Sequence, residues 1–190
     1  MYINKKMYYD TIVCKNLSNS EIDVLKHELS IHGNRWTQHL TDLNFTALKD
    51  GKTIHINWYD DSGLRNVHTA WDKFPKTYDI IRTFTKEKLG RVYWHRLLPG
   101  DTILPHSDAS VAFVKSGLLK RRYQLYLDID PNTEIFFDNR YIDVSKINFS
   151  IIDFPLKTLH FYKNKSNSTL YILVFDIFAE GDGIEPGFIL

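Results

Sequence analysis

The sequence predicts a mostly β fold, a double-sheet jelly roll, with two or more helices from the N-terminal half packed on one sheet. From Arg91 onward, short runs of β-branched and aromatic residues recur with turn residues between them. Before Arg91, two segments show the apolar spacing of helices. The chain of 190 residues has no internal repeat and no linker, which fits one domain with a sizeable core.

Eight strands are expected in the second half of the chain. Their ranges are 91–98, 103–106, 121–130, 134–137, 140–143, 147–154, 158–163 and 170–178. Pro99-Gly100 predicts a tight turn, because proline presets φ and glycine allows a positive φ. Further turns are expected at residues 130–133 and 138–139. Eight short strands at this spacing are typical of a jelly roll.

The first half of the chain mixes helices and strands. Ser18 and Glu21 form a capping box, and the helix that follows has Ile22, Leu25 and Leu29 on one face and ends at Gly33. A second helix is expected from Pro75 to Leu89, closed by Gly90. Strands are expected at 11–15 and 53–58, whereas 37–50 is ambiguous.

Composition excludes several classes of protein. A net charge of +1 gives no sign of a nucleic-acid-binding surface, and no nucleic-acid partner is expected. The single cysteine, Cys14, excludes an internal disulfide and fits a reducing compartment. Neither a signal peptide nor a membrane-spanning segment is recognisable, so no membrane partner and a cytoplasmic location are expected.

The clearest chemical motif is His106-Ser107-Asp108, with His160 far downstream. Two histidines and one carboxylate are the minimum set that holds Fe(II) on one face and leaves the other face open. A jelly roll brings distant strands side by side, so His106, Asp108 and His160 are the expected metal ligands and catalytic centre. Zinc accepts similar ligands, but the helical His-Glu-x-x-His arrangement of many zinc hydrolases is absent. A surface aspartate with two half-buried histidines is the structural alternative.

The surroundings of this motif resemble one enzyme family. An apolar strand, the Pro99-Gly100 turn and a second short strand lead to His106 and Asp108. Residues 149–154, His160 and the apolar strand 170–176 follow. This pattern, over about residues 91–178, resembles the aspartyl/asparaginyl β-hydroxylase family of Fe(II)/2-oxoglutarate oxygenases, which also contains free-proline hydroxylases.

The resemblance implies a double-stranded β-helix, cupin-like, and an enzyme that uses Fe(II), 2-oxoglutarate and O2, with ascorbate as an assisting reductant. Residues 1–190 would be one oxygenase domain. Its parts would be an N-terminal support and substrate region (1–90), the jelly-roll core (91–178) and a tail (179–190). The substrate would be a free amino acid or an Asp, Asn or Pro side chain in a peptide. Related halogenating enzymes have Gly or Ala at the place of Asp108, so the carboxylate implies hydroxylation.

The family also implies which residues bind 2-oxoglutarate. Arg122 matches an arginine on the strand after the His-x-Asp motif, and Gln124 and His95 match two further polar contacts. Strand alternation puts Arg122, Gln124 and Tyr126 on one face. Leu170 stands where the family commonly has an arginine for the distal carboxylate, so Arg122 with His95 is expected to take that role, and Lys163 and Lys165 are alternatives. A solvated strand-edge charge (Arg122) and a core histidine (His95) are the structural alternatives.

Two other functions stay open at this point. One is a jelly-roll binding module without catalysis, and the other is a metal-binding oxygenase relative that no longer uses 2-oxoglutarate, which Leu170 makes worth testing. The substrate-facing elements are expected within residues 35–75, where Trp58, Trp71 and Arg65 are candidates. Core packing is the other reading of both tryptophans.

Overall fold

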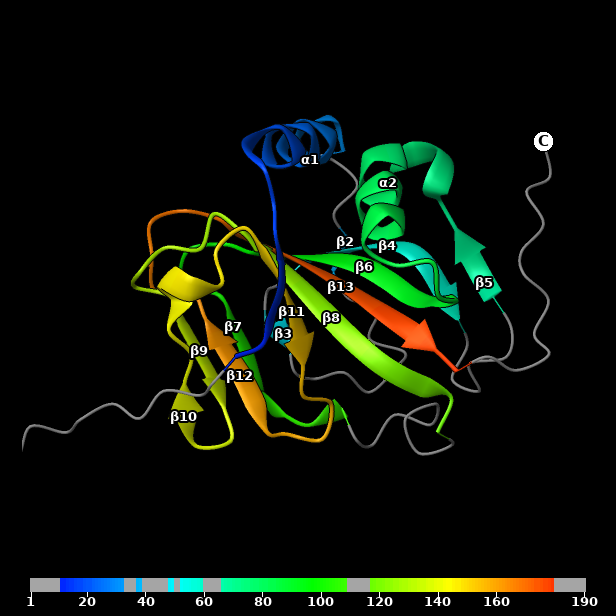
Figure 1. Ribbon diagram of the computed structural model, residues 1–190. Helices are drawn as coiled ribbons and strands as arrows, with labels where there is room; N and C mark the ends of the chain where they lie inside the picture. Colours follow the sequence, from blue (N-terminus) through cyan, green and yellow to red (C-terminus); the bar gives the residue numbers. More distant parts are fainter. Residues whose placement is uncertain are drawn as a thin grey trace, which may run out of the picture.

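A computed structural model of the chain describes residues 11–32, 37–38, 48–49, 52–59, 66–108 and 117–179. Two antiparallel sheets and two helices make up this part (Figure 1). The mostly β jelly roll with helices on one sheet, expected from the sequence, is confirmed. Among the described helices, none is long and apolar enough to cross a membrane.

The larger sheet has eight strands in the order β1-β11-β8-β13-β6-β4-β2, and β5 pairs with β4 beside this path. Their bounds are Val13–Asn16 (β1), Ser150–Phe154 (β11), Leu119–Leu127 (β8), Leu170–Phe178 (β13), Leu89–Leu97 (β6), Lys52–Tyr59 (β4), Thr37–Gln38 (β2) and Asn66–Thr69 (β5).

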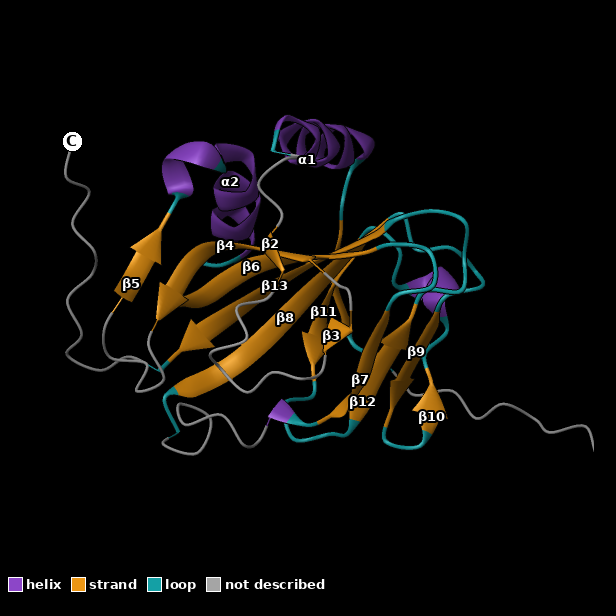
Figure 2. Cartoon of the chain, turned by 180° about the vertical axis from the view of Figure 1, so that it is seen from behind, coloured by secondary structure: helices purple, strands orange, loops and turns teal. Residues whose placement is uncertain are grey.

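The smaller sheet has five strands in the order β10-β9-β12-β7-β3. Their bounds are Arg140–Tyr141 (β10), Glu134–Phe137 (β9), His160–Lys163 (β12), Thr102–His106 (β7) and Leu48–Lys49 (β3). Figure 2 shows the two sheets as separate layers that diverge from one end, with the helices on the far side of the larger sheet.

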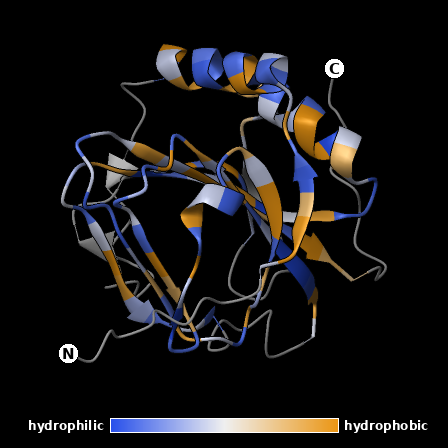
Figure 3. Cartoon of the chain, turned by 60° about the vertical axis from the view of Figure 1, so that its left-hand side comes forward, coloured by the Kyte–Doolittle hydropathy of each residue, from blue (hydrophilic) through white to orange (hydrophobic). Residues whose placement is uncertain are grey.

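The helices cover one face of the larger sheet. They are α1 (Asn19–Ile31) and α2 (Pro75–Phe84), and α2 follows the short 3-10 helix η2 (Trp71–Lys73). The ribbon of α1 alternates between hydrophilic and hydrophobic residues in Figure 3, as one buried face requires. Leu25 of α1 packs in one core with Trp94, Leu125 and Phe175 of the sheet.

A second core fills the space between the two sheets. Leu97, Tyr126 and Ile172 of the larger sheet belong to it, together with Phe137 and Tyr162 of the smaller sheet. The strands of the larger sheet thus contribute alternate residues to two cores, one on each face. The face turned toward the smaller sheet is the one that bears the predicted site residues of β8.

Most predicted elements are confirmed within a few residues of their ends. The capping box of Ser18 and Glu21 is present, and the ambiguous region contributes the short strands β2 and β3. The second helix is shorter than predicted, because it ends at Phe84 and not at Leu89. Leu89 instead begins β6 and pairs with Ile177 of β13, so sheet pairing takes precedence over helical spacing. Gly33 and residues 180–190 of the tail lie outside the described residues.

Glu28 of α1 caps the N-terminus of α2. Phe74, at the N-cap position, offers no side-chain hydrogen bond. The buried Glu28 carboxylate accepts hydrogen bonds from the backbone N–H of Lys76 at 2.7 Å and from the backbone N–H of Thr77 at 2.9 Å. It also accepts the Thr77 hydroxyl at 2.6 Å. One carboxylate therefore satisfies three donors and joins the two helices.

We predict that Glu28→Ala lowers the free energy of unfolding by about 2 to 4 kcal/mol, because it leaves these three donors without their acceptor. Urea denaturation followed by circular dichroism measures this. Asp23→Ala is the control, since Asp23 is an exposed acid on the same helix, and its effect should stay within about 0.5 kcal/mol. Equal effects of the two substitutions would contradict the capping role.

Candidate metal centre

The two predicted histidine ligands lie opposite each other in the smaller sheet. His106 is the last residue of β7, His160 is the first of β12, and the two are Cα partners in the antiparallel register. The ring centroids are 4.2 Å apart. The predicted turn before β7 is present, with Gly100 at φ 88° and a hydrogen bond from the Asp101 N–H to the Leu98 carbonyl. This turn leads the chain from β6 of the larger sheet into β7.

Asp108 completes a cluster that fits a metal ion. Its Oδ1 lies 3.6 Å from His106 Nε2, and its Oδ2 lies 3.9 Å from His160 Nε2. One possible ligand atom from each of the three residues lies within 4.8 Å of the others. Asp108 and His160 are buried, and His106 is partly exposed. Two imidazole nitrogens and one carboxylate oxygen at these separations suit a divalent transition metal.

Both histidines are oriented by backbone carbonyls. His106 Nδ1 lies 2.8 Å from the Leu104 oxygen, and His160 Nδ1 lies 2.9 Å from the Thr158 oxygen. A carbonyl accepts only, so Nδ1 donates in each ring and carries the proton. Nε2 then keeps its lone pair, and in both rings it is the atom near Asp108. The tautomer that a metal ligand needs is thus built into the strand ends.

The charges of the cluster also suit a metal ion. Burial lowers the pKa of His160 to about 4, so this ring is neutral at physiological pH. Burial opposes ionisation of Asp108, but the Arg122 guanidinium and the two histidines outweigh it and keep the pKa of Asp108 below its ordinary value. A neutral imidazole and an ionised carboxylate are the forms that bind metals.

Arg122 joins the metal cluster to the larger sheet. Its Nη1 donates to Asp108 Oδ2 at 2.6 Å. Its Nε and Nη2 donate to the two oxygens of Asp176, at 2.6 and 2.9 Å. Arg122 was expected to hold the distal carboxylate of 2-oxoglutarate, but all three nitrogens contact these two carboxylates. Its contact with 2-oxoglutarate stays a prediction, and the sequence analysis missed Asp176.

Gln124 lies one step further along the inner face of β8. Its amide oxygen accepts hydrogen bonds from the Tyr126 hydroxyl and, at 2.9 Å, from the Tyr162 hydroxyl. All three side chains are buried. Tyr162 was not singled out from the sequence, although its position two residues after His160 places it on the same face of β12. The Gln124 amide nitrogen is the part of this group that can donate to a ligand.

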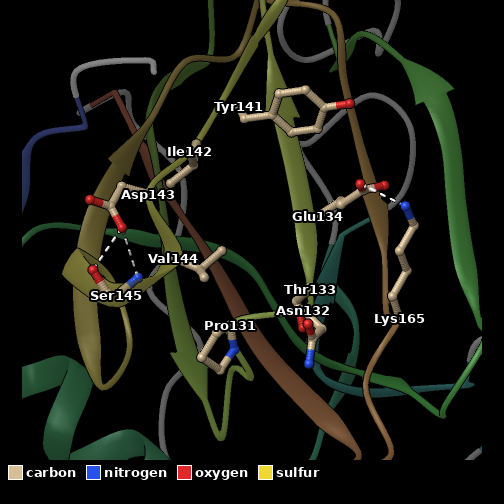
Figure 4. A pocket seen from close by; sticks show the side chains of 10 residues that line it. All are labelled: Pro131, Asn132, Thr133, Glu134, Tyr141, Ile142, Asp143, Val144, Ser145 and Lys165. Atoms are coloured by element: carbon tan, nitrogen blue, oxygen red, sulfur yellow. Dashed lines mark hydrogen bonds and ion pairs between the residues drawn. The ribbon is translucent and has the colours of Figure 1, made fainter. Parts of the chain in front are cut away.

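The other predicted site residues lie at several places. His95 of β6 is half-buried, and its Nδ1 is 2.9 Å from the Thr53 hydroxyl. Leu170 is buried in the core between the sheets. Lys163 is exposed. Lys165 pairs with Glu134 at 2.7 Å beside a pocket of about 550 Å³, where Figure 4 shows the two side chains reaching toward each other.

The two candidate tryptophans have different surroundings. Trp58 stacks on His55 with ring centroids 4.0 Å apart, and the Arg91 guanidinium carbon lies 4.2 Å from the Trp58 ring centroid. Trp71 packs against Tyr78 at the helix-covered core. Trp71 therefore packs against the core under the helices, and Trp58 packs against the other core, between the two sheets. Arg65 lies outside the described residues.

A comparison with protein-family profiles shows the family of the chain. The profile of aspartyl/asparaginyl β-hydroxylase matches residues 19–180 of the chain. The chain belongs to this family. It is therefore a hydroxylase-family enzyme, as the motif around His106 and His160 suggested. A search of curated proteins found no match.

Solved structures show the same fold at low sequence identity. A Pseudomonas putida prolyl-4-hydroxylase aligns with a TM-score of 0.58 at 12% identity, over 91% of this chain and 94% of that chain. A 2OG-Fe(II) oxygenase family oxidoreductase from Burkholderia pseudomallei gives 0.57 at 13% identity, over 88% and 81%. The viral collagen prolyl hydroxylase of Paramecium Bursaria Chlorella virus-1, solved as a 2OG complex, gives 0.50 at 17% identity, over 94% and 100%.

The expected cofactors agree with these findings. Fe(II) and 2-oxoglutarate (2OG) are named together for the Burkholderia structure, and 2OG is named for the viral one. The cluster of His106, Asp108 and His160 supplies the ligand types that Fe(II) requires.

The buried His160 predicts how the stability of the metal-free protein depends on pH. Its pKa is about 4 in the folded state and near its ordinary value of 6.5 in the unfolded state. Between pH 6.5 and pH 4 the His160 imidazole is therefore protonated in the unfolded state and neutral in the folded state. Stability is lost as the pH falls from 6.5 to 4, by about 3 kcal/mol at the lower end.

His160→Gln removes this titration. Between pH 7 and pH 4 the wild type should therefore lose about 3 kcal/mol more unfolding free energy than His160→Gln does. Urea denaturation of both proteins in the presence of a chelator measures this. Parallel pH profiles of the two proteins would show that His160 titrates normally in the folded state.

Proposed function

We propose that the protein is an Fe(II)/2-oxoglutarate-dependent dioxygenase that hydroxylates a free amino acid or an Asp, Asn or Pro side chain in a peptide. The observation that carries this proposal is the cluster of His106, Asp108 and His160, with both Nε2 atoms turned toward one carboxylate. The family supports hydroxylation. Prolyl hydroxylation in two of the aligned structures supports the choice of substrates.

In this proposal His106, Asp108 and His160 hold the iron on one face. Bound iron, together with 2-oxoglutarate and O2, supplies the oxidising chemistry. The protein contributes two oriented imidazoles, of which the buried His160 is neutral, and a carboxylate that is kept ionised. The buried walls around His160, including Phe154 and Phe137, keep water from this side of the site.

The presence of a carboxylate at position 108 bears on the outcome of the reaction. In this proposal Asp108 would take the metal position that a halide would take if the residue were Gly or Ala. Its ion pair with Arg122 at 2.6 Å keeps it charged and in place. Hydroxylation is therefore the proposed reaction.

For 2-oxoglutarate we propose contacts from the inner face of the larger sheet. The proposed contacts are Gln124 of β8 and His95 of β6, because both side chains bear hydrogen-bond donors. Arg122 lies on β8 between Gln124 and the metal cluster. With Leu170 in place of an arginine, the distal carboxylate would rely on neutral donors such as the Gln124 amide nitrogen, which the two tyrosine hydroxyls orient by donating to the amide oxygen.

The surroundings of Leu170 and Arg122 also favour one alternative function. Leu170 is buried and Arg122 already pairs with two carboxylates, as expected of a metal-binding relative that does not use 2-oxoglutarate. Anaerobic addition of Fe(II) and 2-oxoglutarate distinguishes the two. A weak charge-transfer band in the visible supports the dioxygenase, and bound iron without this band supports the alternative.

We predict that His106→Ala, Asp108→Ala and His160→Ala each abolish stoichiometric Fe(II) binding, because two remaining ligands hold Fe(II) weakly. Anaerobic metal titration measures the binding, and circular dichroism verifies the fold. His27→Ala is the matched control, since His27 is exposed on α1, and should bind iron as the wild type does. Full iron binding by two of the three ligand variants would rule out this metal site.

We also predict that the iron-loaded protein, with 2-oxoglutarate, O2 and ascorbate, forms succinate slowly on its own and faster with the right substrate. The product should gain the mass of one oxygen atom. Mass spectrometry over free amino acids, then over peptides with Asp, Asn or Pro, measures this, with His106→Ala as the inactive control. No succinate above that control would refute the dioxygenase.

A further inference from the structure

We propose that Arg122 and Asp176 are positioning residues for the metal ligand Asp108. Together they hold the Asp108 carboxylate so that one oxygen is occupied by a hydrogen bond and the other is presented to the metal. This proposal deepens the proposed function, because it rests on Asp108 being a ligand.

The register of the larger sheet forms the first half of this arrangement. Arg122 of β8 and Asp176 of β13 are direct cross-strand partners. Two parallel hydrogen bonds, Nε to Oδ1 and Nη2 to Oδ2, fix the plane of the guanidinium. Both side chains are buried, so water does not loosen this pair. The remaining nitrogen, Nη1, therefore points in a direction that the sheet itself determines.

The second half of this arrangement is a hydrogen bond between the two sheets, from Arg122 to Asp108. Nη1 donates to Asp108 Oδ2 at 2.6 Å, and Asp108 follows β7 of the smaller sheet. Both histidine ligands also belong to the smaller sheet. The larger sheet thus orients the one ligand that lies beyond the end of a strand, where the backbone by itself fixes a side chain least.

The hydrogen bond has a consequence for coordination. Because Arg122 occupies Oδ2, Oδ1 is the oxygen with the freer lone pairs, and it lies 3.6 Å from His106 Nε2. A carboxylate held in this way favours binding through one oxygen. Binding through one oxygen would leave more of the metal open to other ligands than binding through both oxygens would.

Asp176 has a separate part in this proposal. Arg122 alone would place a full positive charge beside the metal and repel it. Asp176 compensates that charge, since both of its oxygens accept parallel N–H donors from Arg122 in the way that an ionised carboxylate does. Arg122 can then orient Asp108 without opposing the binding of a cation.

A double variant tests positioning apart from charge. Arg122→Gln with Asp176→Asn removes one positive and one negative charge, so the net charge around Asp108 is unchanged and neither member of the Arg122–Asp176 pair is left charged without the other. One amide cannot reach both carboxyl positions as the guanidinium does. Co(II) is the probe, because its visible absorption reports the coordination number, and its binding is measured without 2-oxoglutarate.

We expect the double variant to bind Co(II) roughly 10- to 100-fold more weakly than the wild type and to show a changed visible spectrum. Arg121→Gln is the matched control, since Arg121 is the exposed neighbour on the same strand, and should retain both the affinity and the spectrum. Wild-type affinity and spectrum in the folded double variant would overturn the proposal.

The single variant Arg122→Gln provides a second test. It makes the surroundings of Asp108 equally or more negative, so an effect of charge alone predicts equal or tighter Co(II) binding. Positioning predicts weaker binding, and equal or tighter binding with an unchanged spectrum would overturn it. If the double variant does not fold, the comparison of Arg122→Gln with the wild type still separates positioning from charge.

His106→Ala separates the inference from the proposed function. If His106→Ala abolishes Co(II) binding and the Arg122 variants leave it intact, only the positioning role fails. If His106→Ala also leaves Co(II) binding intact, the metal site itself is wrong and both fail.

Discussion

The pairing of β7 with β12 is the constraint on which the site depends. It sets His106 opposite His160 across one antiparallel register. Two imidazoles held in this way need no loop to bring them together, and their backbone hydrogen bonds turn both Nε2 atoms toward the same carboxylate. A shift of one residue in this register would turn one of the rings to the opposite face of the sheet.

The larger sheet supports this arrangement because it is buried on both faces. One face packs against α1 and α2, and the other lines the space above the smaller sheet. A strand held from both sides moves little, so Arg122 of β8 and Asp176 of β13 can keep fixed positions. The helices, which bear none of the proposed ligands, thereby contribute to the rigidity of the site.

The relation to the aligned hydroxylases lies in the fold more than in shared residues. At 12–17% identity the two-sheet architecture is retained over most of the chain. The position where a family arginine is common holds the buried Leu170, whereas the guanidinium of Arg122 lies at the metal end. In the proposed function, recognition of the distal end of the co-substrate would then rely on neutral donors such as the Gln124 amide nitrogen, which two tyrosine hydroxyls orient.

The sequence by itself determined what depends on local periodicity and motif. The capping box at Ser18, the alternation of Arg122, Gln124 and Tyr126, and the His106, Asp108 and His160 set were all readable, because neighbouring residues and motif spacing specify them. Only the tertiary structure decided that helix α2 ends at Phe84 and that Arg122 pairs with Asp176 and Asp108. Arg122 and Asp176 are 54 residues apart in the chain. Their contact follows from the register between β8 and β13, which packing of both sheet faces selects and no local pattern contains.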